Sequence, residues 1–287
     1  MPELPEVETV RRGLEKAISG YTVTDIQIFD SRSIKRNLGP QQDFKRELTG
    51  AKFQSFERRG KFLWMPLEAN RCLVTHLGMS GQVLVRTPGQ PSDKCERLRI
   101  FVQKGKKNLE VRFIDQRLCG GMYLDELVVY GAGEALPQSA SHIARDPLEQ
   151  DFDIERVVDV IRGRSAGIKS LLLNQEILSG IGNIYADETL WLSKVHYLTP
   201  GKSLTKARVR EIVQTAQMVM EKAVEQGGTS FDEQYKNVNG ESGYFSQSLN
   251  AYGQTGLPCS RCGTLIKREA WANRGSHFCP RCQRRKG

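Results

Sequence analysis

The spacing of hydrophobic residues divides this chain into a strand-rich first part and a helical second part. An apolar stripe with 3.6-residue spacing predicts a helix over residues 1–18. Short runs that alternate apolar and polar positions, such as Leu98, Ile100 and Val102, predict strands from residue 22 to about 130. Turn-forming residues recur between these runs. One leading helix followed by several short strands predicts a β-sandwich.

The second part begins after a change in composition. Residues 131–147 are rich in Gly, Pro and Ser, and we expect an interdomain linker over 133–150. Beyond it, apolar residues recur at helical spacing in a stripe over 154–161 and in a longer one over 204–223. The Ser-, Asn- and Gly-rich segment 227–250 predicts a long loop, a kind of segment that is commonly functional.

The expected fold class is therefore α+β, in three modules. These are an N-terminal β-sandwich with a leading helix, a helical domain and a C-terminal cysteine-rich module. The ranges are 1–132 for the sandwich, 133–150 for the linker, 151–250 for the helical domain with its loop 227–250, and 251–287 for the last module.

Charge narrows the range of partners. The 287 residues contain 42 Lys and Arg against 33 Asp and Glu, a formal net charge of +9. This surplus favours an anionic partner, and nucleic acid is the commonest, although a generally basic protein would have the same composition. No apolar run approaches the ~18 residues of a membrane span, and the N-terminus is acidic rather than basic. We expect a cytoplasmic protein with no membrane partner.

The cysteine spacing predicts a metal site. Cys259-x-x-Cys262 and Cys279-x-x-Cys282 are separated by sixteen residues, the spacing of a zinc ribbon. Four thiolates complete a closed tetrahedron, so one Zn²⁺ is expected to be structural rather than catalytic. Free thiols and an iron–sulfur centre are the alternatives.

The N-terminal segment carries a candidate nucleophile. Pro follows Met1, so removal of Met1 would leave Pro2 as a terminal secondary amine. An α-amino group titrates near about pH 8, so part of it is neutral and nucleophilic at physiological pH. Such an amine can attack a sugar C1′ to give an iminium, with Glu3 beside it to move protons. The bland alternative is an ordinary helix start, with Glu6 either supporting a pocket or favouring the helix dipole.

The string Pro2-Glu3-Leu4-Pro5-Glu6-Val7-Glu8-Thr9 closely resembles the N-terminus of formamidopyrimidine-DNA glycosylases, bacterial repair enzymes that excise oxidised purines. The resemblance extends to Cys282. It implies a bifunctional DNA glycosylase and abasic-site lyase that binds damaged duplex DNA as a monomer at the nucleoid and needs no organic cofactor. It implies catalytic roles for Pro2, Glu3, Lys61 and Arg274.

Other segments resemble the family's DNA-binding parts. His76-Leu77-Gly78-Met79 is similar to the turn in which Met79 would replace the extruded base, with His76 near the DNA. The helical domain resembles a helix–two-turns–helix, and this implies that Arg164, Lys169 and Asn183 contact phosphates. The segment 227–250 resembles a loop over the flipped purine, which favours the purine-directed branch.

Two segments depart from the family pattern. In Asp115-Gln116-Arg117-Leu118-Cys119-Gly120, Arg117 matches the residue facing the orphaned base, but Leu118 and Cys119 replace an Arg and an aromatic wedge. Cys95 stands where a phosphate-contacting His is usual. Two alternatives therefore stay open: an oxidised-pyrimidine glycosylase of the same family, and a non-catalytic zinc-finger protein that binds damaged DNA.

Overall fold

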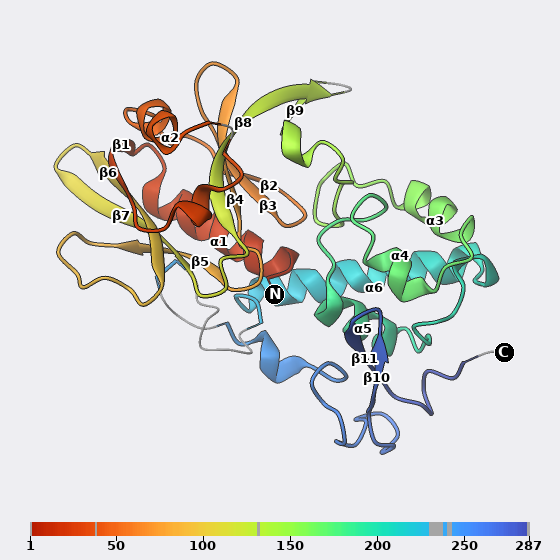
Figure 1. The fold of residues 1–287 in the computed structure, drawn as a ribbon. Helices are drawn as coiled ribbons and strands as arrows, with labels where there is room; N and C mark the ends of the chain where they lie inside the picture. Colours follow the sequence, from red (N-terminus) through yellow and green to blue (C-terminus); the bar gives the residue numbers. More distant parts are fainter. Residues whose placement is uncertain (1, 38, 131–132, 230–237, 240–242, 286–287) are drawn as a thin grey trace. The chain divides into compact units, whose positions relative to one another are not determined.

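The computed structural model describes two compact units (Figure 1). It describes all residues except 1, 38, 131–132, 230–237, 240–242 and 286–287. One unit, here called the sandwich unit, consists of Met1–His142 and Gly227–Gly243. The other, the helical unit, consists of Ile143–Gln226 and Tyr244–Gly287. None of the described helices is long and apolar enough to cross a membrane.

Two antiparallel sheets form the sandwich unit, as the alternating pattern predicts. The first sheet has the order β1-β6-β7-β5, with bounds Thr22–Ile28, Glu96–Lys104, Lys107–Asp115 and Gly81–Arg86. The second has the order β2-β3-β4-β8-β9, with bounds Glu57–Arg59, Phe62–Pro66, Arg71–His76, Gly121–Tyr130 and Glu134–Pro137. In β6, buried and half-buried residues alternate from Glu96 to Val102, and the inward set includes Leu98, Ile100 and Val102.

The leading helix α1, Leu4–Ile18, contributes to the same core. Its buried residues Val7, Val10 and Leu14 belong to one apolar cluster with residues from both sheets. Full burial of each such side chain is worth about 2 kcal/mol. Pro5 lies in the first turn, where its missing N–H costs nothing. The core thus fixes the position of the residues at the start of this helix.

Some elements of the sandwich unit differ from the sequence expectation. Helix α2, Gln41–Leu48, and the short 3₁₀ turn η1, Ser31–Ile34, lie in the range that was expected to consist mostly of strands. The expected linker 133–150 contains strand β9, which pairs with β8, and the 3₁₀ turn η2, Gln138–Ala140. A four-residue strand flanked by turn formers has no clear apolar alternation, and for this reason the segment resembles a linker.

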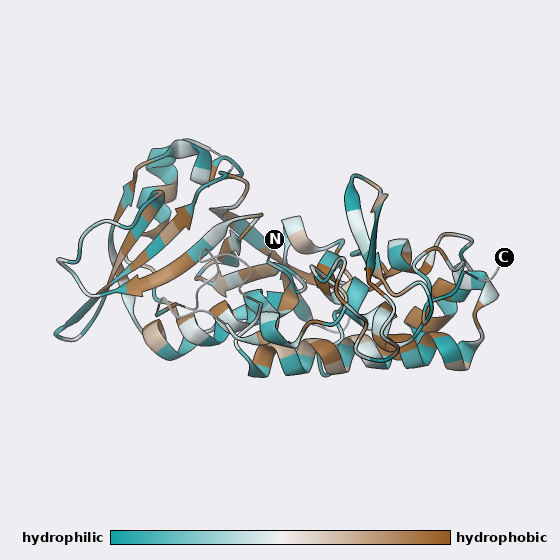
Figure 2. Cartoon of the chain, turned by 90° about the horizontal axis from the view of Figure 1, so that it is seen from below, coloured by the Kyte–Doolittle hydropathy of each residue, from teal (hydrophilic) through white to brown (hydrophobic). Residues whose placement is uncertain are grey.

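The helical unit contains four α-helices among its described residues, followed by a small hairpin. The helices are α3, Ile154–Arg162; α4, Ile168–Leu172; α5, Asn183–Leu192; and α6, Lys206–Glu225. The short 3₁₀ turns are η3, Gly201–Ser203, and η4, Phe245–Ser248. The hairpin strands are β10, Lys267–Trp271, and β11, Arg274–Phe278. Helices with hydrophobic and hydrophilic bands are visible in Figure 2, and they follow the apolar stripes of the sequence.

The expected loop 227–250 is divided between the two units. Its described residues up to Gly243 belong to the sandwich unit, and those from Tyr244 belong to the helical unit. Much of the expected lesion-covering part, 230–237 and 240–242, lies outside the described residues.

Candidate active site and nucleic-acid interface

The candidate nucleophile Pro2 is buried directly before α1. Glu3, only 1% exposed, is the N-cap of this helix and forms a reciprocal capping box with Glu6. The Glu3 N–H donates to Glu6 Oε2 at 2.8 Å, and the N–H and Oγ1 of Thr229 donate to Glu6 Oε1 at 2.8 and 2.9 Å. Glu6 is therefore a buried acceptor that holds the helix start, and is not a solvated charge at a helix end.

The turn that carries Lys61 is attached to the same helix. Gly60, with φ of 55°, reverses the chain between β2 and β3 and leaves Lys61 half-buried. The Arg58 guanidinium donates to Glu8 Oε2 at 2.9 Å and to the Gly60 carbonyl at 3.2 Å. This one side chain fixes the Lys61 turn against α1, the helix that begins beside Pro2.

Glu8 is ionised under all ordinary conditions. Burial alone would raise its pKa, but hydrogen bonds and charge from Arg11, Arg58 and Arg12 lower the pKa to about 2. Glu8 thus supplies a permanent negative charge for Arg58. Without this partner the buried guanidinium would lose the interaction that directs it toward the Gly60 carbonyl.

His76 is held neutral at the end of β4. Burial, together with the charges of Arg36 and Lys61, lowers its pKa to about 4. Its Nδ1 accepts the Gly78 N–H at 3.1 Å, so the proton of the neutral ring is on Nε2. His76 can therefore offer an N–H donor to a phosphate oxygen but brings no positive charge near pH 7.

Met79 and Arg117 lie on two turns of the sandwich unit. Met79, 42% exposed, lies between β4 and β5, and the exposed Arg117 lies between β7 and β8. Leu118 beside Arg117 is half-buried with φ of 53°, and Cys119 is exposed. Cys95 also has positive φ, and its carbonyl accepts the Asp115 N–H at 3.1 Å. Cys119 therefore lies in the Arg117 turn itself, and Cys95 is hydrogen-bonded to Asp115 at the start of that turn.

In the helical unit, two of the predicted phosphate contacts converge on the hairpin. Lys169 Nζ and Asn183 Nδ2 donate to the Gly275 carbonyl at 3.2 and 3.0 Å. Gly275 follows Arg274, which is exposed at the start of β11. Arg164 is also exposed, in the segment between α3 and α4. The structure thus brings Lys169 and Asn183 against the backbone beside Arg274.

Lys169 differs in placement from a surface phosphate contact. It is fully buried, pairs with Asp187 Oδ1 at 2.7 Å and donates to Ser276 Oγ at 2.8 Å. Asp187 Oδ2 accepts both the backbone N–H and Nδ1 of His277, at 2.9 and 3.0 Å. A buried cation needs such a partner, because desolvation without one is expensive. Lys169 therefore holds the hairpin in this structure.

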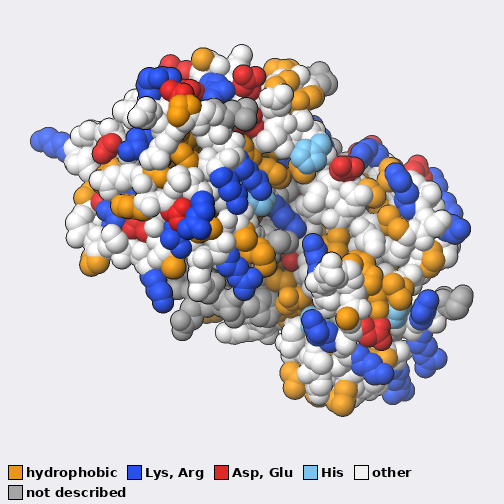
Figure 3. All heavy atoms as spheres, viewed as in Figure 1, with side chains coloured by type: hydrophobic (Ala, Val, Ile, Leu, Met, Phe, Trp, Pro, Cys, Tyr) orange, Lys and Arg blue, Asp and Glu red, His pale blue; other side chains and the backbone are white. Residues whose placement is uncertain are grey.

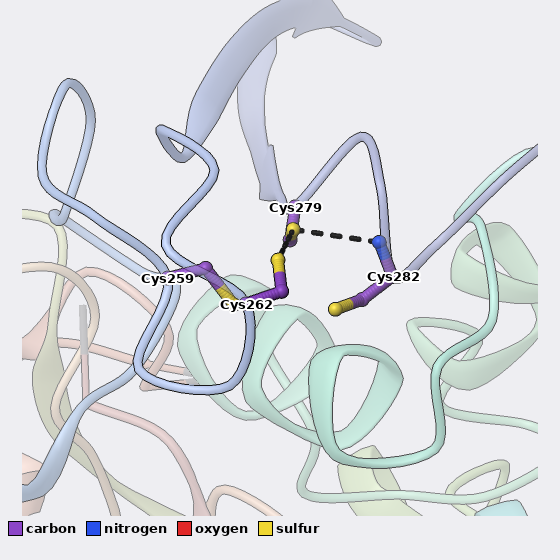
Figure 4. Close-up of side chains that lie close together, drawn as sticks. All are labelled: Cys259, Cys262, Cys279 and Cys282. Carbon is purple, nitrogen blue, oxygen red and sulfur yellow. Dashed lines mark hydrogen bonds between the residues drawn. The ribbon is translucent and has the colours of Figure 1, made fainter.

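The four predicted metal ligands form one cluster (Figure 4). The Sγ atoms of Cys259, Cys262, Cys279 and Cys282 all lie within 4.8 Å of one another. Cys262 Sγ and Cys279 Sγ are 3.5 Å apart. Tetrahedral Zn–S bonds of about 2.3 Å require S–S separations of about 3.8 Å, so the donor set fits one Zn²⁺. With four thiolates no coordination position stays open, and the zinc is structural.

The cluster is packed on α5. Cys259, Cys279 and Ile266 share a small apolar core with Trp191, and the Arg261 guanidinium lies 3.8 Å from the centre of the Trp191 ring. The Gln283 side chain accepts the Cys279 N–H at 2.9 Å and donates to the Val195 carbonyl at 3.0 Å. These contacts connect the zinc module to the helix that carries Asn183 and Asp187.

Sequence reasoning missed several residues that position the site. Asp187 lies four residues after Asn183 on one helix face, and that spacing is the one signal that could have identified it. Gln175 spans the two-turn link: its side chain accepts the Gly180 N–H at 2.9 Å and donates to the Ile181 carbonyl at 3.0 Å. The contact of Glu8 with Arg58 gave no signal, since the two residues are fifty positions apart.

The surface charge agrees with an anionic partner. On the face shown in Figure 3, Lys and Arg side chains outnumber Asp and Glu side chains. Arg117, Arg164 and Arg274 are each exposed.

Comparisons with known proteins cover the whole chain. A model of the formamidopyrimidine-DNA glycosylase N-terminal domain matches residues 1–122, and a model of the H2TH domain of the same enzymes matches residues 143–234. A model of the zinc finger found in FPG and IleRS matches residues 256–285.

Similar full-length proteins are formamidopyrimidine-DNA glycosylases. The chain is 50% identical to the protein of Leifsonia xyli subsp. xyli, over 99% of this chain and 100% of the relative. It is also 50% identical to that of Rhodococcus erythropolis, over 99% and 97% of the two chains.

Among solved structures, a Lactococcus lactis FPG mutant in complex with a Fapy-dG containing DNA superposes with a TM-score of 0.85 at 33% identity, covering 99% of this chain and 100% of that one. A structure of MutM with carbocyclic 8-oxo-G containing DNA has a TM-score of 0.84 at 33% identity and the same coverage.

Proposed function

The chain belongs to the formamidopyrimidine-DNA glycosylase family, and on this premise we propose how its own residues excise an oxidised purine from duplex DNA and cleave the abasic product. The substrate is double-stranded DNA that carries 8-oxoguanine, a formamidopyrimidine or an abasic site, in base excision repair. The protein works as a monomer in the cytoplasm, at the nucleoid.

Pro2 is the nucleophile of this proposal. With Met1 removed, its neutral secondary amine attacks C1′ of the flipped nucleotide, and the bond from C1′ to the damaged base breaks. The departing base takes the bonding electron pair and a proton. Opening of the sugar ring then gives an iminium between Pro2 and C1′. Glu3, at the adjacent position and buried, provides the proton that O4′ needs on ring opening.

The iminium makes strand cleavage possible. It acidifies the C2′ hydrogen, so loss of that proton expels the 3′ phosphate by β-elimination, and a second elimination expels the 5′ phosphate. Lys61 and Arg274 are the cations proposed to neutralise these phosphates as they leave. Hydrolysis of the remaining imine by water regenerates the amine.

DNA binding combines phosphate contacts with residues that enter the helix. Arg164 and Asn183 contact phosphates, His76 donates through Nε2, and Met79 and Arg117 occupy the gap opposite the extruded base. Because Lys169 is buried against Asp187, its proposed role becomes the orientation of the Arg274 hairpin. The zinc ion shapes that hairpin and takes no part in the reaction.

The observation that carries this proposal is the construction of the N-terminus. Pro2 and Glu3 are buried at a capping box whose Glu6 accepts hydrogen bonds from Glu3 and Thr229, and Arg58 attaches the Lys61 turn to the same helix. An ordinary helix start would not need a buried acidic pair or a link to a basic turn.

Borohydride trapping tests the proposal. Reduction of the iminium should cross-link the wild-type protein to a duplex containing 8-oxoguanine, whereas Pro2→Gly and a variant that retains Met1 should lose most of this product. Pro5→Gly is the matched control, since it makes the same chemical change in the first turn of α1 and should trap normally.

The same experiment separates the alternatives. A wild-type protein that binds the duplex but gives no cross-link is a non-catalytic damage-binding protein. Faster excision of an oxidised pyrimidine than of 8-oxoguanine would place it in the pyrimidine-directed branch and contradict the proposed substrate.

A further inference from the structure

Asp115 joins the two turns that carry Met79 and Arg117. This last residue of β7 is fully buried, and its Oδ1 accepts the Ser80 hydroxyl and, at 3.1 Å, the Arg117 N–H. Its Oδ2 accepts the Gly120 N–H at 2.8 Å. The Ser80 Oγ in turn accepts the Arg117 N–H at 3.0 Å. One carboxylate thus reaches the first and last parts of one turn and the serine that follows Met79 in the other.

The two turns also pack backbone against backbone. A Cβ on Gly78 would lie 2.4 Å from the Gly120 nitrogen, and a Cβ on Gly120 would lie 2.6 Å from the His76 carbonyl oxygen. Gly78 has φ of 62°, a conformation that favours glycine on its own account. The backbones of the two turns are therefore in direct contact, with no room for a side chain at Gly78 or Gly120.

The far side of the Arg117 turn is anchored as well. The Arg97 guanidinium donates to the Asp115 carbonyl at 2.9 Å, and Lys35 Nζ donates to the Leu118 carbonyl at 3.2 Å. Leu118 is held at φ of 53°, which a leucine adopts only when its surroundings require it. Side chains of the sandwich unit therefore hold the Arg117 turn at both of its ends.

We propose that Asp115, acting through Ser80, is a positioning residue that holds Met79 and Arg117 at a fixed separation, so that both enter the DNA as one preformed wedge. The inference rests on the proposed contacts of those two residues with DNA. Arg117 would face the orphaned base at a height set by Asp115, and discrimination between opposite bases would depend on this carboxylate. A preformed wedge avoids the entropic cost of ordering two loops on binding.

Asp115→Asn is the sharpest probe. The amide is almost isosteric but turns one acceptor into a donor that faces an N–H or a hydroxyl. Ser80→Ala removes only the link to the Met79 turn, and Ser80→Thr restores a hydroxyl. Asp125→Asn is the matched control: this buried carboxylate accepts the N–H groups of Glu126 and Ser139 at 2.8 and 2.9 Å, elsewhere in the sandwich unit.

Two measurements give the readout. The first is the single-turnover rate of 8-oxoguanine excision, measured opposite cytosine and opposite adenine. Each rate is divided by the rate of borohydride trapping on a single-stranded abasic oligonucleotide, which has no opposite base. For Asp115→Asn and Ser80→Ala we expect this ratio to fall about 10- to 100-fold, with reduced discrimination between cytosine and adenine. Ser80→Thr should recover most of the loss, and Asp125→Asn should leave the ratio and the discrimination unchanged.

The second measurement does not depend on catalysis. With 2-aminopurine opposite a tetrahydrofuran abasic analogue, entry of the wedge unstacks the reporter and raises its fluorescence. Asp115→Asn and Ser80→Ala should lower this signal at saturating protein, whereas Asp125→Asn should not. Equal effects of Asp115→Asn and Asp125→Asn, or unchanged discrimination and fluorescence in Ser80→Ala, would overturn the inference. Loss of trapping in the wild-type protein would contradict the proposed function and leave the fluorescence test of the wedge valid.

Discussion

Asp115 in the sandwich unit and Asp187 in the helical unit perform similar tasks by different means. Each is a buried carboxylate that accepts a backbone N–H close to an exposed arginine, Arg117 in one case and Arg274 in the other. Asp115 accepts hydrogen bonds from neutral donors, whereas Asp187 also pairs with the buried Lys169. The basic tip is thus held by hydrogen bonds from neutral groups to Asp115 in one unit, and with a buried ion pair at Asp187 in the other.

The difference follows from the surroundings of each tip. The turns of the sandwich unit emerge from two sheets with a large core and are packed together through Gly78 and Gly120. The hairpin of the helical unit has only two five-residue strands, and β10 is almost entirely exposed. A hairpin of this size cannot hold its own core, so it depends on the metal and on the buried ion pair.

Removal of zinc should have the largest effect on folding, and this effect should be confined to the module that carries Arg274. Structural zinc contributes about 10 kcal/mol or more to the folding of such modules, so Cys279→Ser or a strong chelator should unfold residues 251–287. DNA affinity should fall at least about 100-fold through the loss of Arg274 contacts, as measured by fluorescence anisotropy at fixed salt.

The sandwich unit supplies the control for zinc removal. Amide hydrogen exchange in β6 and β7 should stay as slow as in the zinc-loaded protein, while protection in β10 and β11 disappears. Cys72→Ser, a buried cysteine outside the cluster, should leave zinc content unchanged. Loss of β6 protection on chelation would show that the Arg117 turn and the Arg274 hairpin are not stabilised independently of each other.

The zinc cluster and the sandwich were predictable because their signals are local. The Cys-x-x-Cys pairs and the alternation around Ile100 each occupy a few neighbouring residues. Helix α2 was missed because its eight residues bury only Phe44 and Leu48, too few for a recognisable stripe. Strand β9 was missed because turn formers surround it and its partner β8 provides the pairing.

The candidate site was predictable in its residues and only partly in its arrangement. A resemblance can identify Lys169 as important, but no local pattern shows that Asp187 and Ser276 enclose its ammonium group. The link from Glu8 through Arg58 to the Lys61 turn is likewise a long-range contact between charged residues. Such contacts depend on the tertiary fold, which the spacing of residues along the chain does not contain.

Asp187→Asn should destabilise the helical unit by about 3–5 kcal/mol, because it leaves the Lys169 charge buried without its partner. Urea unfolding followed by Trp fluorescence measures the loss, since Trp191 and Trp271 both lie in this unit. Asp115→Asn leaves no buried charge behind and should cost the sandwich unit less, about 1–3 kcal/mol.

The double variant Lys169→Met/Asp187→Asn isolates the charge. Removal of both partners should recover a large share of the stability lost in Asp187→Asn, since no uncompensated ion remains. Costs that simply add would show that the ion pair is not what distinguishes Asp187 from Asp115.

Acid should weaken the contacts that Glu8 makes with Arg58, Arg11 and Arg12 in the sandwich unit. The folded-state pKa of Glu8, about 2, lies below its ordinary value of 4.5. Its stabilisation is therefore fully present above about pH 4.5 and is lost as pH falls toward 2, by a total of roughly 3 kcal/mol. Glu8→Gln should flatten this part of the pH profile of unfolding free energy. Glu15→Gln, an exposed partner of Arg11 on the same helix, should leave it nearly unchanged.

Leu118→Gly should give the smallest change in the free energy of unfolding, and it should stabilise the protein where the other variants destabilise it. Leucine at φ of 53° costs about 1 kcal/mol in backbone strain, which glycine relieves, while the extra freedom of glycine in the unfolded chain offsets part of the gain. We expect a net stabilisation below about 1 kcal/mol by thermal unfolding. Cys119→Gly, beside it without positive φ, should destabilise by a similar amount. If Leu118→Gly also lowers discrimination between opposite bases, the rigidity of the Arg117 turn depends on the strained leucine as well as on Asp115. If discrimination is unchanged, that rigidity comes from the Asp115 carboxylate and from the packing of Gly78 against Gly120.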